Sequence, residues 1–125
     1  MNNQMFELVP RFREKIWGGK KLQEIYGFDT GFEQTGEAWI VTSLAGNEDN
    51  SIVGSNLSLS QLYKAHRELF GNITNEICPI KDMIVDTKQQ VSIQCHPDDE
   101  YGMKHDNSLG KPEGLLIISV EPGSK

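Results

Sequence analysis

The sequence lacks the features that define several large protein classes. No apolar run is longer than four residues, whereas a helix needs about 20 predominantly apolar residues to cross a bilayer. The first residues carry neither the basic start nor the apolar stretch of a signal peptide. The two cysteines, Cys78 and Cys95, are too few for a disulfide framework. We therefore expect a cytoplasmic protein with reduced thiols and no membrane partner.

Positive charge is also scarce. Twelve Lys and Arg residues stand against eighteen Asp and Glu residues, which gives a formal net charge of -6 and no basic stripe. Proteins that bind nucleic acids depend on Lys and Arg side chains that neutralise phosphates. We therefore expect no nucleic-acid partner. Internal repeats and low-complexity tracts are absent from the sequence as well, which argues against a solenoid.

The composition that remains is that of a globular domain. The chain has 125 residues, of which 37% are hydrophobic and 24% are charged. A chain of this length forms one domain on the usual prior and buries about two-thirds of the surface that its unfolded form exposes. We expect a single domain over residues 1–125.

Alternating side chains predict several β-strands. Residues 36–42 alternate most clearly, with Glu37, Trp39 and Val41 on one face. The polar run at residues 46–50 predicts a turn, and residues 51–53 are its expected hairpin partner. Further strand-like runs are rich in apolar and β-branched residues; they occupy residues 5–9, 83–85, 90–96 and 114–120.

Helices are fewer in this pattern. Ser58 and Gln61 have the spacing of a capping box, which predicts a helix from Ser58 that ends at Gly71. A second helix is expected over residues 20–26. The sequence therefore predicts a mainly β fold with one or two helices, either an antiparallel sandwich or an open barrel.

The chemically informative stretch reads Ser-Ile-Gln-Cys-His-Pro-Asp-Asp at residues 92–99. In a strand, Ser92, Gln94 and His96 share one face, as in a strand that lines a pocket. The Gln94 carbonyl oxygen and the His96 imidazole could take two corners of a divalent metal ion. The alternative is an ordinary hydrogen-bonded pair without a metal, which is the commoner use of such a motif.

A second polar group, Gly-Lys-Pro-Glu, follows at residues 110–113. Pro112 stiffens the chain at this point. Glu113 could supply an anionic oxygen ligand, and Lys111 could contact a substrate oxygen as an electrophile or a proton carrier. The alternative is a solvated ion pair in a loop.

Taken together, five segments resemble the type I phosphomannose isomerases, which are zinc-dependent mannose-6-phosphate isomerases, in their shorter bacterial form. The resemblance implies a cupin-like (jelly-roll) antiparallel β-domain, of which residues 1–125 would be a partial, N-terminal portion. The segments follow the family's order; they are residues 15–19, 35–39, 68–71, 92–99 and 110–113.

The resemblance also implies roles for individual residues. Gln94, His96 and Glu113 match metal ligands, Lys111 matches a catalytic lysine near the reacting carbons, and Ser92 together with Lys111 matches the substrate-binding pocket. The family interconverts mannose 6-phosphate and fructose 6-phosphate through a cis-enediolate, with zinc holding the sugar oxygens. Its remaining metal-binding histidine and an active-site arginine belong to a later part of a longer chain, and no motif in residues 1–125 replaces them. We therefore expect an incomplete site.

Three functions remain open at this point. The first is a mannose-6-phosphate isomerase portion with weak or absent zinc binding and little activity on its own. The second is a non-catalytic cupin-like module that binds a sugar phosphate. The third is assembly into a homo-oligomer through exposed strand edges, which invite pairing with another copy.

Overall fold

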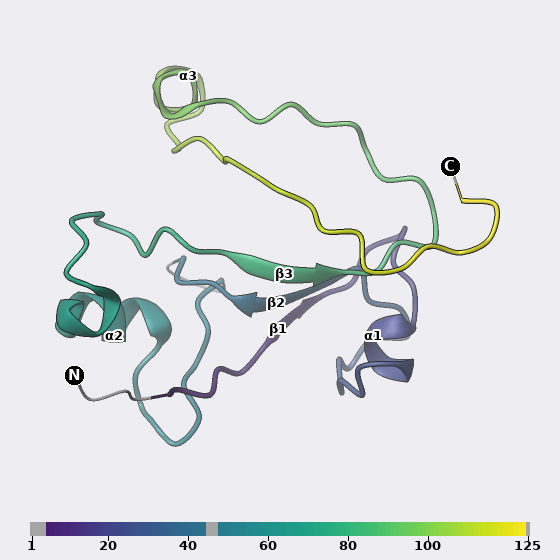
Figure 1. The fold of residues 1–125 in the computed structure, drawn as a ribbon, viewed down its shortest axis with the longest axis horizontal. Coiled ribbons are helices and arrows are strands. Elements are labelled where there is room, and N and C mark those ends of the chain that lie inside the picture. Colours follow the sequence, from purple (N-terminus) through teal and green to yellow (C-terminus); the bar gives the residue numbers. More distant parts are fainter. Residues whose placement is uncertain (1–4, 45–47, 125) are drawn as a thin grey trace. The chain divides into compact units, whose positions relative to one another are not determined.

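The computed structural model describes residues 5–44 and 48–124. The chain forms two compact units, Met1–Val91 and Ser92–Lys125. The first unit contains a sheet and two α-helices, and the second contains one α-helix between two long connecting segments (Figure 1). Part of the predicted turn, residues 46 and 47, lies outside the described residues.

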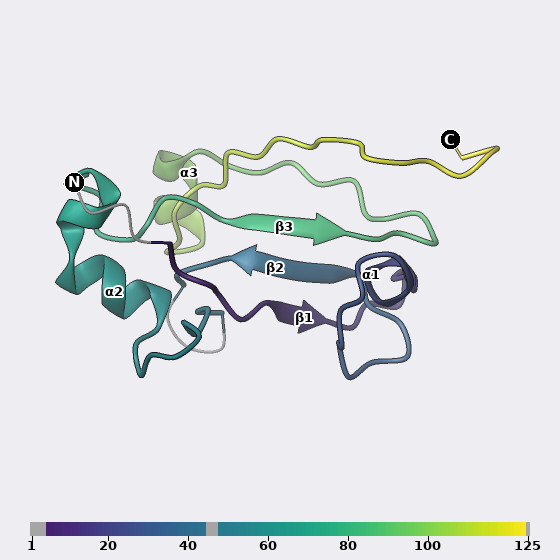
Figure 2. The same cartoon turned by 60° about the horizontal axis from the view of Figure 1, so that its bottom comes forward.

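The sheet of the first unit is antiparallel and has the order β1-β2-β3 (Figure 2). Its strands are β1 (Arg11–Arg13), β2 (Glu37–Val41) and β3 (Asp82–Val85). On the central strand, Ala38 lies opposite Phe12 on one side and Ile84 on the other, and Ala38 is fully buried. The predicted strands at residues 36–42 and 83–85 are confirmed, as is the antiparallel sheet of the predicted fold class.

Trp39 on β2 contacts side chains from β1, from β2 and from the residue before β3. The Arg13 guanidinium lies 4.6 Å from the centroid of the Trp39 ring, and the Lys81 ammonium lies 3.5 Å from it. The indole Nε1 donates a hydrogen bond of 2.9 Å to Glu37. Such cation–π contacts strengthen when the ring is withdrawn from water, and Trp39 is only 7% exposed. Trp39 is therefore a core aromatic residue of the sheet.

The N-terminal segment pairs differently from the prediction. Instead of a strand over residues 5–9, the structure has a single bridge between Leu8 and Ile52. Val53 donates its backbone N–H to Glu7 at 2.9 Å, so residues 51–53 pair with this segment. The preceding residues return to the end of the central strand: the backbone N–H of Asn50 donates to Thr42 at 3.0 Å, and a bridge joins Asp49 to Ser43. Residues 51–53, the predicted hairpin partner of the central strand, therefore pair with the N-terminal segment instead.

Helix α2 (Leu59–Ala65) begins as predicted. Ser58 Oγ accepts from the backbone of Gln61, and the Gln61 side chain accepts from the backbone of Ser58, which completes the capping box. His66 then leaves the helical conformation, so the chain continues as a separate 3-10 helix, η1 (Arg67–Phe70). Gly71 ends it in the left-handed conformation, at φ 74°.

Helix α1 (Lys21–Glu24) is short, and a distant side chain satisfies its first turn. Lys20 at its N-cap makes no side-chain cap bond, but the Asp86 carboxylate accepts from the backbone N–H of Lys21 at 2.8 Å. A Cβ atom at Gly19 would overlap this carboxylate, and one at Gly18 would lie 2.6 Å from the backbone nitrogen of Gly36. Glycine at residues 18 and 19 therefore leaves room for the backbone of Gly36 and for the Asp86 carboxylate.

A fully buried amide, Asn50, joins three segments of the first unit. Its Oδ1 accepts from the backbone N–H of Thr42 at 2.5 Å, and its Nδ2 donates to the carbonyls of Val9 at 2.8 Å and Trp39 at 3.2 Å. Apolar side chains are buried as well; those at most 6% exposed are Leu22, Ala38, Ile52, Leu59, Leu62 and Tyr63. Buried polar groups of this kind stabilise a fold only while each has its partner.

The second unit contains helix α3 (Asp99–His105), which the sequence analysis did not predict. The helix begins because the side chain of Asp98 accepts from the backbone N–H of Tyr101, as an N-cap does. No strand is present in the described part of this unit, so the strands predicted at residues 90–96 and 114–120 are wrong. A strand needs a hydrogen-bonded neighbour, and these runs have no ladder in the described residues. Among those residues, no helix has the length and apolar character to cross a bilayer.

Replacement of Asn50 by Ala is expected to lower the free energy of unfolding by at least about 2 kcal/mol, because it leaves buried backbone groups without partners. The measurement is urea denaturation of the chain. Asn56→Ala is the matched control, since Asn56 is exposed, and its effect should stay within about 0.5 kcal/mol. Equal denaturation midpoints for the two variants would show that the Asn50 bonds do not stabilise this core.

Candidate functional site

The five predicted site residues all belong to the second unit. Ser92, Gln94 and His96 precede helix α3, and Lys111 and Glu113 follow the helix. The connecting segments on either side of α3 therefore carry the whole candidate site (Figure 1).

Glu113 lies at the centre of the first group of side chains. Its Oε2 is 3.7 Å from His96 Nε2 and 2.5 Å from Lys111 Nζ. The side chains of His96 and Glu113 are 26% and 34% exposed, so both are half-buried and reachable from solvent. The structure thus brings together three of the predicted residues, with a carboxylate between an imidazole and an ammonium group.

The second group consists of Ser92 and Gln94. The Gln94 Nε2 donates a hydrogen bond of 2.7 Å to Ser92 Oγ. Residues two apart in extended backbone lie on the same face, so this bond agrees with the predicted polar face. The alternative reading, a hydrogen-bonded pair of Gln94 and His96, stays a prediction, because this bond joins Gln94 to Ser92. The bond uses the amide nitrogen of Gln94, whereas the carbonyl oxygen is the atom that would ligate a metal.

A backbone contact brings the two ends of the site together. The backbone N–H of Lys111 donates to the carbonyl of Pro97 at 3.2 Å, which places the residues before Pro97 next to those after Lys111. Asp99, which the sequence analysis did not single out, also contributes by accepting the backbone N–H of Gly110 at 2.8 Å. The sequence signal that could have identified Asp99 is its position directly after Asp98, which is the N-cap residue of α3.

The donor atoms fit a zinc ion in part. With zinc–ligand bonds of about 2.0–2.1 Å and tetrahedral angles, two donor atoms stand about 3.4 Å apart. The 3.7 Å between His96 Nε2 and Glu113 Oε2 is close to this separation. Within residues 5–44 and 48–124, however, no three His, Cys, Asp or Glu side chains gather into a metal-holding group. The pair therefore fits two ligands of one ion, with the Gln94 carbonyl as the candidate third.

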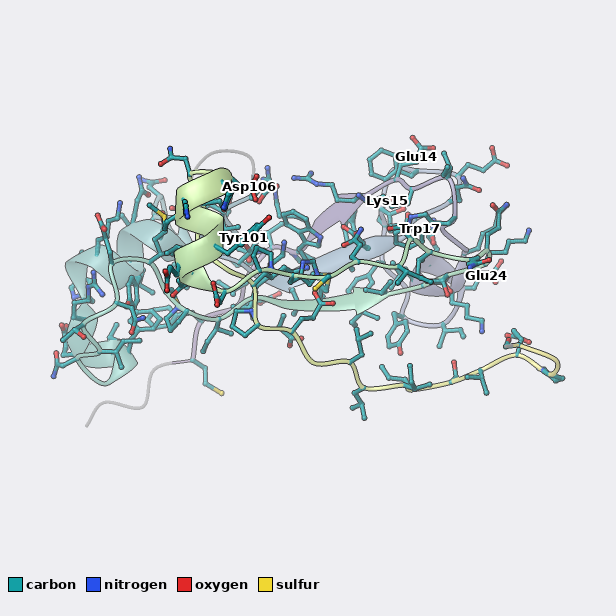
Figure 3. The ribbon with its side chains drawn as sticks, turned by 90° about the horizontal axis from the view of Figure 1, so that it is seen from above. Glu14, Lys15, Trp17, Glu24, Tyr101 and Asp106 are labelled. Carbon is teal, nitrogen blue, oxygen red and sulfur yellow. The ribbon has the colours of Figure 1, made fainter. Side chains whose placement is uncertain are left out.

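The other two histidines have different surroundings. His66 Nδ1 lies 3.0 Å from Glu68 Oε1. A hydrogen bond from its own backbone lowers the pKa of Glu68, and the hydrogen bond with His66 adds to this effect. His105 stacks on Tyr101 of α3, with ring centroids 4.3 Å apart; Figure 3 labels Tyr101 on this helix. Neither histidine belongs to the candidate site.

The match to known proteins extends over almost the whole chain. Residues 5–112 match the family described as phosphomannose isomerase type I, catalytic domain. The chain belongs to this family. It is 35% identical to a mannose-6-phosphate isomerase of Streptococcus mutans, over 94% of this chain and 38% of that protein. It is 36% identical to mannose-6-phosphate isomerase ManA of Bacillus subtilis, over 97% of this chain and 39% of that protein.

A solved structure gives the same result. The crystal structure of mannose 6-phosphate isomerase from Bacillus subtilis matches with a TM-score of 0.78 and 32% sequence identity. The match covers 84% of this chain and 34% of the solved chain. It confirms both the resemblance to the phosphomannose isomerases and the predicted fold class of a partial β-domain. The chain spans less than two-fifths of the length of the curated relatives it matches.

Four of the five segments that resemble the family form two groups, one in each unit. Residues 15–19 and 35–39 pack against each other in the first unit, where a bridge joins Gly19 to Thr35. Figure 3 shows Lys15 and Trp17 in this region, and Lys15 Nζ lies 3.6 Å from Glu37. These two motifs therefore contribute to the packing of the first unit. The residues suited to chemistry are in the segments at 92–99 and 110–113.

Replacement of Lys111 by Met is expected to tighten zinc binding about fivefold. The ammonium group competes for the Glu113 oxygen, and two unit charges about 4 Å apart in water interact by about 1 kcal/mol. Isothermal titration with zinc measures the change. Lys104→Met is the control, because it removes the same charge from an exposed position on α3. An identical affinity for the two variants would mean that Lys111 does not act on the metal ligands.

Proposed function

We propose that this chain supplies part of the metal-binding and sugar-binding site of a mannose-6-phosphate isomerase. The reaction is the interconversion of mannose 6-phosphate and fructose 6-phosphate. The observation that supports the proposal is the grouping of His96, Lys111 and Glu113 around one carboxylate oxygen. This grouping occurs in a chain that belongs to the phosphomannose isomerase family.

The metal ligands in this proposal are His96 and Glu113, with Gln94 as the third. A divalent metal, for which we propose zinc, supplies Lewis-acid polarisation of the sugar oxygens when bound. The neutral imidazole and the carboxylate are ligand types that zinc accepts. A shell drawn from this chain alone is short of donors, so we expect weak binding.

Lys111 is the proposed catalytic residue and also contacts the substrate. Its Nζ is fixed by Glu113 at 2.5 Å, while its side chain remains 45% exposed. An ammonium group has three donors, so Lys111 can bind Glu113 and still donate to a sugar oxygen. Ser92, whose hydroxyl accepts from Gln94, contributes a polar group to the substrate pocket.

The composition supports the remaining parts of the proposal. A formal charge of -6 suits neither a nucleic-acid backbone nor an acidic membrane surface. The family match supports a small sugar phosphate as the partner, with Lys111 as the positive charge near it, and we propose the cytoplasm as the location.

The chain alone is expected to show little or no isomerase turnover with mannose 6-phosphate and added zinc, because its site is incomplete. A coupled assay that follows fructose 6-phosphate measures this. Turnover comparable to that of a full-length relative, and lost in His96→Ala, would contradict the incomplete site. If calorimetry shows binding of mannose 6-phosphate without turnover, the result favours the non-catalytic module. If no heat of binding is detected at millimolar mannose 6-phosphate, a sugar-binding module is excluded.

Self-association is a further candidate function, favoured by one apolar segment of the second unit. Residues 115–118 are four consecutive apolar side chains, each at least 68% exposed. No ladder pairs them within the described residues. An extended apolar segment without a neighbouring strand can pair with a second copy.

Sedimentation at high protein concentration is expected to reveal a dimer that Ile117→Lys weakens by at least tenfold, because a charge in the paired segment opposes association. Leu109→Lys is the control, since Leu109 is 56% exposed and lies outside the segment. A clean monomer of the unaltered chain at every concentration would contradict self-association.

A further inference from the structure

The loop that contains α3 is closed at its base by two hydrogen bonds. The Asp99 Oδ1 accepts from the backbone N–H of Gly110 at 2.8 Å, across eleven residues. One position further on, the backbone N–H of Lys111 donates to the carbonyl of Pro97 at 3.2 Å. Together these bonds join the beginning of the loop to its end.

The packing at this closure leaves no room for a side chain on Gly110. A Cβ atom there would lie 2.5 Å from the carbonyl carbon of Asp98 and 2.6 Å from the carbonyl oxygen of Pro97. Inside the loop, Gly102 is buried, and a Cβ on it would lie 2.6 Å from the carbonyl oxygen of Ser108. The returning chain therefore runs directly against the start of the loop.

The two adjacent aspartates of this loop have different partners. Asp98 accepts from Tyr101 at 2.8 Å and so caps its own helix. Asp99 is already inside the helix, and its carboxylate reaches out to the returning chain. The helix cap and the loop closure therefore depend on different side chains and can be removed separately.

The site residues that meet lie directly on either side of this closure. His96 comes directly before the loop, and Lys111 and Glu113 come directly after the bond from Gly110. This arrangement accompanies the 3.7 Å distance between His96 Nε2 and Glu113 Oε2. We propose that Asp99 is a positioning residue, whose carboxylate holds Lys111 and Glu113 beside His96 for metal and sugar binding. The inference rests on the proposed function of these three residues.

Positioning and simple charge attraction predict different results for one conservative variant. Asparagine at this position keeps a carbonyl oxygen that can accept the Gly110 N–H, but it removes the negative charge. Alanine removes both. If Asp99 acts through its hydrogen bond, Asp99→Asn should retain most of the function that Asp99→Ala loses.

The test compares Asp99→Ala and Asp99→Asn with Glu100→Ala and Glu100→Gln. Glu100 is the next residue of the same helical turn and is exposed, so its variants carry the same changes of charge and size. The first measurement is hydrogen exchange of the Gly110 amide by NMR, without metal. The second is the affinity for zinc by isothermal titration.

Asp99→Ala is expected to speed the exchange of the Gly110 amide at least tenfold and to weaken zinc binding by about tenfold, the lower end of the usual effect of a residue that orients metal ligands. Asp99→Asn should remain within about threefold of the unaltered chain, and both Glu100 variants within about twofold, since no metal ligand depends on them. Unchanged exchange at amides of the first unit shows that the variants remain folded.

Two results would overturn the proposal. In one, Asp99→Ala exposes the Gly110 amide but weakens zinc binding no more than Glu100→Ala does. In the other, Asp99→Asn is as defective as Asp99→Ala, which assigns the effect to charge. If the unaltered chain binds no zinc, the proposed metal site is contradicted. The positioning role of Asp99 is then tested by side-chain NOEs between His96 and Lys111. Their loss in Asp99→Ala but not in Asp99→Asn supports it, and their persistence in both overturns it.

Discussion

Each unit of this chain depends on side chains that satisfy backbone groups far away in the sequence. A sheet of three short strands leaves many backbone N–H and C=O groups without a ladder partner, and buried groups of this kind need a hydrogen bond. Asn50 meets this need for backbone groups of Val9, Trp39 and Thr42, and Asp86 meets it for the first turn of α1. Asp99 likewise accepts from a distant backbone N–H, an exposed one, on the return from α3. Short polar side chains thus satisfy backbone groups that would otherwise be hydrogen-bonded within longer strands and helices.

The same constraint determines the geometry of the candidate site. Its residues lie on connecting segments rather than on paired strands, so no sheet fixes their separation. The bond from Lys111 to Pro97 and the bond from Gly110 to Asp99 close the loop instead. They leave Glu113 between a positive ammonium group and an imidazole. In the function proposed above, that carboxylate would both ligate the metal and hold the lysine beside a sugar oxygen.

Local patterns were predictable from the sequence, and distant contacts were not. Alternation identified β2, and the spacing of Ser58 and Gln61 identified the start of α2, because both signals reside in neighbouring residues. The bond from Asp86 to Lys21 spans 65 positions, and no local pattern encodes it. The runs at 90–96 and 114–120 have the composition of strands, but pairing depends on a neighbour that composition does not specify.

Helix α3 and the candidate site show the same difference between local patterns and distant contacts. Asp98 carried a usable signal for the helix, since Asp is one of the preferred N-cap residues. The grouping of His96 with Glu113 was expected from the family resemblance alone, because the two lie on opposite sides of a helix that the sequence analysis did not predict. The polar face of Ser92 and Gln94 was predictable from the two-residue period of extended backbone.

We propose that His96 and Glu113 form part of one metal site. The most direct measurement is a zinc titration of the chain that follows the ring nitrogens of its three histidines by NMR. We expect that the His96 signals shift with zinc, that the His66 and His105 signals stay unchanged, and that Glu113→Gln weakens the response of His96. A response of His66 or His105 with His96 unchanged would contradict it.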